Sequence, residues 1–175
     1  MEIHAVRRIE PNEEITVTYI DHRFPRDVRQ RALQQWHFTC QCAWCSLSTE
    51  ESLQSDRNRH EILNWGDNYP PVSLWSGLTP LSAMRSSISE GETIIEICKK
   101  EGLEMLTQLF AIDMVFAYSE MADTPNCLKY ARMAFGIALA RQPPGHQQLT
   151  LLQRYLENPR KAAGEAWGKR LPKNV

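Results

Sequence analysis

The stretch of residues 13–45, EEITVTYIDHRFPRDVRQRALQQWHFTCQCAWC, determines the predicted fold. It joins an alternating apolar strand to a short basic helix and ends on three cysteines with the spacing Cys40-x-Cys42-x-x-Cys45. Cysteines this close cannot easily pair in one unstrained disulfide arrangement, whereas their thiolates can converge on Zn²⁺ at about 2.3 Å each. The spacing therefore predicts a zinc site. Structural zinc is almost always four-coordinate, so a fourth ligand has to be found.

Composition sets the outer bounds on the class of protein. A chain of 175 residues that is 42% hydrophobic can bury one ordinary core or two small ones. The N-terminal sequence MEIHAVRRIE has no apolar run of the signal-peptide type, and nowhere do about eighteen apolar residues follow one another. We therefore expect an intracellular protein, nuclear or cytoplasmic, whose reduced cysteines bind metal. The formal charge of −1 argues against general attraction to nucleic acid, and no membrane partner is expected.

Two strands are predicted before the basic helix. Residues 2–9 and 14–20 are joined by a turn at 10–13, where proline and asparagine suit the bend. A lone hairpin is marginally stable, so we expect it to pack on another element. The helix follows at 26–36, and its apolar positions recur every four residues at Val28, Ala32 and Trp36. Its arginines are expected to face water or an acidic surface: Arg26, Arg29 and Arg31.

In this order, the strand, Tyr19-Ile20-Asp21, the basic helix and the segment WHFTCQCAWC resemble the end of a SET domain with its post-SET cysteine motif. SET domains are protein-lysine methyltransferases. The chain is most similar to the MYND-containing members and their fungal relatives, in which a helical, tetratricopeptide-like region follows the cysteines. The resemblance covers residues 1–47 well and the helical remainder loosely.

The resemblance implies a role for each site residue. Tyr19 matches the active-site tyrosine, while Trp36 and Phe38 match positions that wall the lysine channel or the adenine of S-adenosylmethionine; the three cysteines match the zinc ligands. A lysine-bearing protein or peptide is the implied substrate. Methyl transfer from a sulfonium needs a neutral, aligned amine in a shielded channel, and a phenol at its mouth can orient that amine. Without the resemblance, Tyr19 would be interpreted as a core aromatic residue whose hydroxyl reaches water.

The fourth zinc ligand is the main departure from the family. In the family it comes from an upstream Asn-His-x-Cys segment that also binds S-adenosylmethionine, and the 175 residues contain no such segment. We therefore expect the isolated chain to be inactive. Within the chain the alternatives are His37, which adjoins the cluster, and His22, Cys98 and Cys127. The last two lie on apolar helix stripes and are expected to be buried as small hydrophobic residues.

Beyond Cys45 the pattern predicts helices. After a loop at 46–51 and a cap near Ser55, the apolar spacing predicts helices at 55–65, 80–88, 93–100, 103–121, 125–141 and 148–157, with a connector at 72–80. The turn at 122–125 makes the two longest helices an antiparallel pair of the tetratricopeptide kind. The basic tail from Pro159 is expected to be frayed.

The sequence thus predicts an α+β chain, mostly α, made of a small β hairpin, a zinc segment and an antiparallel helical bundle. The expected parts are a SET remnant at 1–35, the post-SET motif at 36–47, a connector with short helices at 48–91, the bundle at 92–157 and a disordered tail at 158–175. Two functions remain open. One is the C-terminal part of a lysine methyltransferase; the other is a zinc-stapled helical module whose groove, built from 92–141, binds a protein partner.

Overall fold

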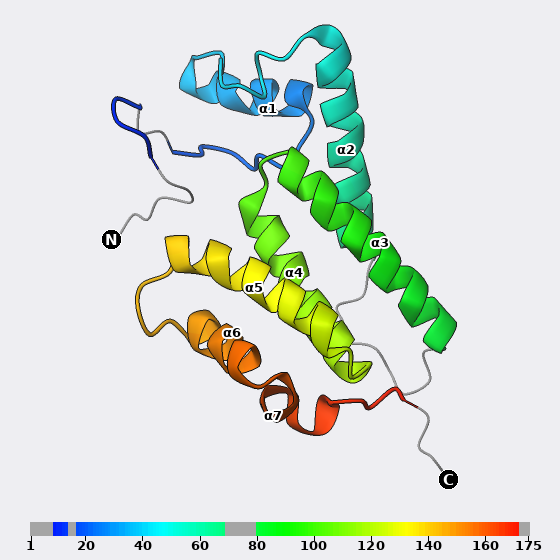
Figure 1. Cartoon of the computed structure of the whole chain (residues 1–175). Helices are drawn as coiled ribbons and strands as arrows, with labels where there is room; N and C mark the ends of the chain where they lie inside the picture. Colours follow the sequence, from blue (N-terminus) through cyan, green and yellow to red (C-terminus); the bar gives the residue numbers. More distant parts are fainter. Residues whose placement is uncertain (1–8, 14–16, 69–79, 172–175) are drawn as a thin grey trace.

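A computed structural model describes residues 9–13, 17–68 and 80–171, and this part of the chain is mostly helical (Figure 1). The predicted turn at 10–13 is present, since the Glu13 N–H donates to the Glu10 carbonyl over 3.1 Å. The predicted hairpin is not shown. Residues 2–8 and 14–16 lie outside the described part, and residues 17–20 have no strand partner within it. The predicted connector at 72–80 also lies almost wholly outside it.

Helices α3 to α6 pack side by side (Figure 1), and α2 packs against α3 and contacts the segment that leads into the first helix, at His22 and Arg26. Short turns join α3 to α4 and α4 to α5, so neighbouring helices run antiparallel. The bounds are α1 Arg26–Leu33, a 3₁₀ turn at Gln34–Trp36, α2 Thr49–Asn68, α3 Leu81–Lys100, α4 Glu104–Glu120, α5 Thr124–Arg141, α6 Gln147–Glu157, α7 Pro159–Ala163 and a second 3₁₀ turn at Gly164–Ala166.

One contiguous apolar core lies between these helices. It runs from Ile62 of α2 to Tyr155 of α6, and Ile95, Met114 and Leu152 at its centre are each less than 2% exposed. Burial of such side chains contributes about 1.5–3 kcal/mol each to folding. None of the helices in the described ranges is long and apolar enough to cross a membrane.

Helix α2 begins six residues earlier than predicted, at Thr49. Ser48 and Glu51 form a capping box: the Ser48 N–H and hydroxyl donate to Glu51 Oε2 over 3.1 and 2.7 Å, and the Glu51 N–H donates back to Ser48 Oγ. Ser55, expected near the start of the helix, lies inside it and donates to Glu101. The Ser-x-x-Glu spacing at 48–51 was the better signal for the start of this helix.

Residues 81–100 form one helix, α3, where two were predicted. Gly91 lies in its middle and is buried. A Cβ at this position would lie 2.8 Å from the Met114 side chain and 3.2 Å from the Trp65 ring. The glycine therefore permits close approach of α4 and α2 instead of breaking the helix.

The basic tail, expected to be frayed, is ordered as far as Leu171. After α7, the Gly168 N–H donates to the Ser119 carbonyl over 2.9 Å, and Arg170 forms an ion pair of 3.0 Å with Glu120. Trp167 packs against the core. These contacts fasten the segment to the end of α4, which its basic composition alone did not indicate.

Candidate metal and aromatic site

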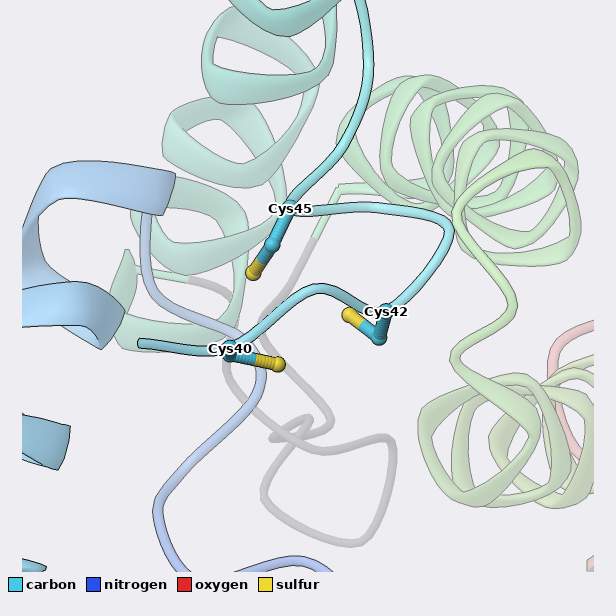
Figure 2. A group of neighbouring side chains, drawn as sticks. All are labelled: Cys40, Cys42 and Cys45. Carbon is cyan, nitrogen blue, oxygen red and sulfur yellow. The ribbon is translucent and has the colours of Figure 1, made fainter. Parts of the chain in front are cut away.

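The three cysteines lie on the loop between the first 3₁₀ turn and α2. Their Sγ atoms are all within 4.8 Å of one another, and the three side chains face a common space (Figure 2). Cys45 is buried, Cys40 is partly buried and Cys42 is exposed. The spacing that predicted a metal site has therefore brought the three thiols together.

Hydrogen bonds to backbone groups, from a side chain and from the backbone itself, shape this loop. The Gln30 side chain of α1 both accepts from the Cys40 N–H over 3.1 Å and donates to the Cys40 carbonyl over 2.9 Å. The N–H groups of Cys45 and Ser46 both donate to the Cys42 carbonyl over 2.9 Å. Together these contacts fix the first cysteine against α1 and fold the next two into one turn.

Hydrogen bonding and burial differentiate the thiols. Burial raises the pKa of Cys40 to about 11. Burial also acts against ionisation of Cys42, but the Cys45 N–H and the neighbouring thiols outweigh it and lower the pKa of Cys42. The exposed thiol of Cys42 therefore ionises more readily than the thiol of Cys40.

The donor set fits zinc in chemistry and spacing. A tetrahedral site with Zn–S bonds of about 2.3 Å requires sulfur–sulfur separations of about 3.8 Å, and the three Sγ atoms lie within 4.8 Å of one another. Within the described ranges, no fourth histidine, cysteine or carboxylate joins the three-cysteine group, so His37 and His22 are not brought into it. Cys98 and Cys127 are fully buried in the helical core, as expected. Burial raises the pKa of the Cys98 thiol to about 12.

Tyr19, Trp36 and Phe38 also come together. The Tyr19 ring lies 5.5 Å from the Trp36 ring and 5.7 Å from the Phe38 ring, in tilted and edge-to-face arrangements. Tyr19 is 53% exposed and the other two are each 41% exposed. Tyr19 is therefore not a core residue, and the three rings form an open aromatic wall next to the cysteine loop.

Arg29, expected to face water or an acidic surface, is only 5% exposed. Its Nη1 donates to the Phe24 carbonyl over 2.6 Å, and its Nη2 lies 3.7 Å from Cys45 Sγ. The buried face of α1 consists of Arg29 and Leu33. Each follows by one residue a position of the predicted apolar stripe, Val28 or Ala32. The periodicity placed apolar residues on the buried side and so missed an arginine that contacts a cysteine.

A second buried arginine, Arg59 of α2, joins the loop to the helical bundle. It pairs with Glu101 over 3.2 Å, donates to the His22 carbonyl, and lies 5.7 Å from the centre of the Trp44 ring. The Trp44 ring in turn lies against Gly102, whose φ is +63°, and a Cβ there would be 3.1 Å from the ring. The cysteine loop thus packs against the turn between α3 and α4.

Proteins similar to this chain are lysine methyltransferases, although no family model matches it. The histone-lysine N-methyltransferase ATXR2 of Arabidopsis thaliana is 46% identical over 43 residues, which are 25% of this chain and 9% of that protein. The N-lysine methyltransferase SMYD2 of Gallus gallus is 30% identical over 96 residues, 54% of this chain and 19% of that protein.

The longest match is to the histone-lysine N-methyltransferase set5 of Schizosaccharomyces pombe, which is 23% identical over 163 residues, 92% of this chain and 49% of that protein. The chain thus spans less than half the length of these relatives. The predicted resemblance to the SET-domain lysine methyltransferases is confirmed, and the three-cysteine group fits a post-SET zinc site.

Proposed function

We propose that these residues are the post-SET segment and the following helical region of an S-adenosylmethionine-dependent protein-lysine methyltransferase. The observation that carries the proposal is the convergence of three thiols on one loop, directly beside the aromatic wall of Tyr19, Trp36 and Phe38. A protein lysine is the proposed methyl acceptor, and a histone is one such substrate. The proposed location is nuclear or cytoplasmic.

Each part has a chemical role in this proposal. Cys40, Cys42 and Cys45 hold a structural zinc ion that fixes the loop, and the metal takes no part in the reaction. S-adenosylmethionine supplies a methyl group on a sulfonium centre. The Tyr19 hydroxyl orients the neutral lysine amine, while the Trp36 and Phe38 rings cover one side of the cleft and exclude water.

We further propose that the 175 residues by themselves do not bind the cofactor. A small-molecule pocket encloses about 70–90% of its ligand, whereas the three aromatic side chains are 41–53% exposed. The Asn-His-x-Cys segment that the resemblance associates with cofactor binding is also missing from these residues. One wall of a cleft cannot supply the positioning that methyl transfer requires.

Metal analysis tests the first part of the proposal. We expect about one zinc ion per purified chain, and a loss of most of it in Cys42→Ser. Gln41→Ser, an exposed change in the same loop, is the matched control and should keep the metal. A metal-free preparation that gives the same fold and does not take up added zinc would contradict the zinc site.

Calorimetry with S-adenosylmethionine tests the second part. The chain alone should give no binding heat at micromolar concentrations, because its aromatic wall is open. Micromolar affinity would contradict the proposed incompleteness of the cleft and would make these residues a binding unit in their own right.

A second candidate function is a tetratricopeptide-like module that binds a protein partner. It is favoured by a shallow hollow of about 170 Å³, lined by Leu103, Thr107 and Ile137 among others. The hollow is smaller than typical ligand pockets of about 300–1,000 Å³, so it would accept one side chain. Titrating a lysine-rich histone-tail peptide while following the amide NMR signals of α5 tests this function. Unchanged signals would exclude that peptide as the partner.

A further inference from the structure

Arg29 is a buried cation that has no carboxylate partner among residues 9–13, 17–68 and 80–171. Its side chain donates to the Phe24 carbonyl and faces Cys45 Sγ, and among the residues that the structure describes no carboxylate lies within 4 Å of its guanidinium group. Burying an unpaired charge is strongly unfavourable, so buried charges in proteins are paired or coordinate metals. Within the described part of the chain, the charge of Arg29 therefore lacks the anionic partner that a buried cation requires.

Arg59 provides the contrast within the same region. It is also buried, at 2% exposed, but Glu101 lies 3.2 Å away and is itself 3% exposed. Ser55 and Asn58 donate to the same carboxylate over 2.6 and 2.7 Å. The charge of Arg59 is compensated by a built-in anion, whereas in the described part of the chain the side-chain partner of Arg29 is the sulfur atom of Cys45.

We infer that Arg29 is the outer cation of the zinc site and couples metal binding to the segment that carries Tyr19. The inference rests on the proposed function, because it requires the cysteines to hold a metal. Three thiolates around one Zn²⁺ carry a net single negative charge, which the guanidinium group balances from a distance of 3.7 Å to Cys45 Sγ. Metal binding thus supplies the anion that Arg29 lacks.

The hydrogen bond from the other guanidinium nitrogen links the metal site to the segment that bears Tyr19. Nη1 holds the Phe24 carbonyl, which lies five residues after Tyr19 along the chain. A planar guanidinium group donates in two directions at fixed angles, so it can hold a carbonyl with one nitrogen and face a sulfur with the other. When the metal fixes the guanidinium group, the segment 17–24 is held as well. Arg29 is in this sense a positioning residue.

Zinc affinity tests the charge role. Arg29→Met keeps an unbranched apolar stem and removes the guanidinium charge, and we expect zinc affinity measured by chelator competition to fall about 10- to 100-fold, as for other outer partners of metal ligands. Arg29→Lys restores the charge without the fork and should recover part of this loss. Arg31→Met removes an exposed arginine from the same helix, which pairs with Asp27, and should leave the affinity unchanged.

Hydrogen exchange tests the coupling. Zinc should slow amide exchange in residues 17–24 of the unaltered chain, and this slowing should be lost in Arg29→Met even at zinc concentrations that fill the site. The cobalt-substituted site should keep its tetrahedral thiolate spectrum in that variant, which separates loss of coupling from loss of the site. Arg29 lies outside the helical core, so circular dichroism should report an intact bundle.

The outcomes separate the inference from the proposed function. Arg29→Met that binds zinc as tightly as the unaltered chain, with the same protection of residues 17–24, would overturn the inference and leave the zinc site standing. An unaltered chain that binds no zinc would remove both. If Arg29→Met and Arg31→Met weakened zinc equally, the effect would be general electrostatics and the inference would be wrong.

Discussion

The cysteine region, residues 17–47, and the helical bundle, α3 to α6, are held together by different forces. In the bundle, apolar side chains from every helix meet in one core. In the cysteine region α1 buries only Arg29 and Leu33, most of the large aromatic side chains are exposed, and the chain is fixed by side-chain bonds to backbone carbonyls. The bundle can therefore fold on apolar burial, whereas the cysteine region depends on polar contacts and on its thiols.

The two regions meet at Glu101 and Gly102, in the turn between α3 and α4. Glu101 neutralises Arg59, and Gly102 accepts the Trp44 ring. Because both regions contact this turn, a substitution here can change the stability of both. It therefore tests most directly whether the two regions are held together by different forces.

Glu101→Ala should therefore have the largest effect. It leaves Arg59 buried without an anion, and breaking a buried ion pair in this way costs about 3–5 kcal/mol. We expect the free energy of unfolding, measured with urea, to fall by that amount. The double variant Arg59→Leu/Glu101→Leu removes both charges and should recover most of the loss. A double variant as unstable as Glu101→Ala would show that the pair acts through its hydrogen bonds to His22 and Ser55 instead of through charge balance.

Leu152→Ala should have the next largest effect and should be confined to the bundle. Leu152 is fully buried on α6, and truncating such a side chain costs about 2–5 kcal/mol. Zinc affinity should not change, because the residue lies in the apolar core and not in the cysteine region. Leu139→Ala, at a position 61% exposed on α5, is the control and should change stability by less than about 0.5 kcal/mol. A fall in zinc affinity in Leu152→Ala would mean that the two regions fold as one.

The features predictable from the sequence were those that depend on local spacing. The apolar period and the Asp123-Thr124-Pro125 start signal predicted α4 and α5 nearly to their ends, and the cysteine spacing predicted that three thiols would meet. The order of aromatic residues and cysteines also identified the relatives. Each of these signals lies within a few residues along the chain.

The features that were missed depend on contacts between distant residues. Residues 81–100 were predicted as two helices, because the partners that need the small size of Gly91, Met114 and Trp65, lie elsewhere in the sequence. Arg29 was placed toward water or an acidic surface because the carbonyl and sulfur that hold it cannot be recognised from its own helix. The tail was expected to fray because its contact with Ser119 and Glu120 follows only from the antiparallel turn of α4 and α5.

Removal of a helix cap should have a smaller effect. Asp123 Oδ1 accepts from the Asn126 N–H over 3.1 Å at the start of α5, and its other oxygen accepts from the Asn126 side chain. Asp123→Ala should cost about 1 kcal/mol of unfolding free energy, since it leaves a helix N–H without its cap. Asp123→Asn keeps the acceptor and should recover most of that stability in thermal or urea unfolding. Equal losses in the two variants would assign the effect to charge at the helix start instead of to the cap hydrogen bond.

Chelation of the metal should have the smallest effect on the bundle and the clearest effect on the cysteine region. If the thiols hold zinc, its removal leaves α1 and the loop with Leu33 and Cys45 as their buried apolar residues, too little to order the segment by burial alone. Hydrogen exchange should therefore accelerate throughout residues 17–47 after chelation, while the amides of α4 and α5 keep their protection and the helical circular dichroism changes little. Added zinc should reverse the change, and added magnesium should not, because a hard cation does not prefer thiolates. If the loss of protection spread into α4, the bundle would need the metal as well, and the two regions would differ in composition but not in what stabilises them.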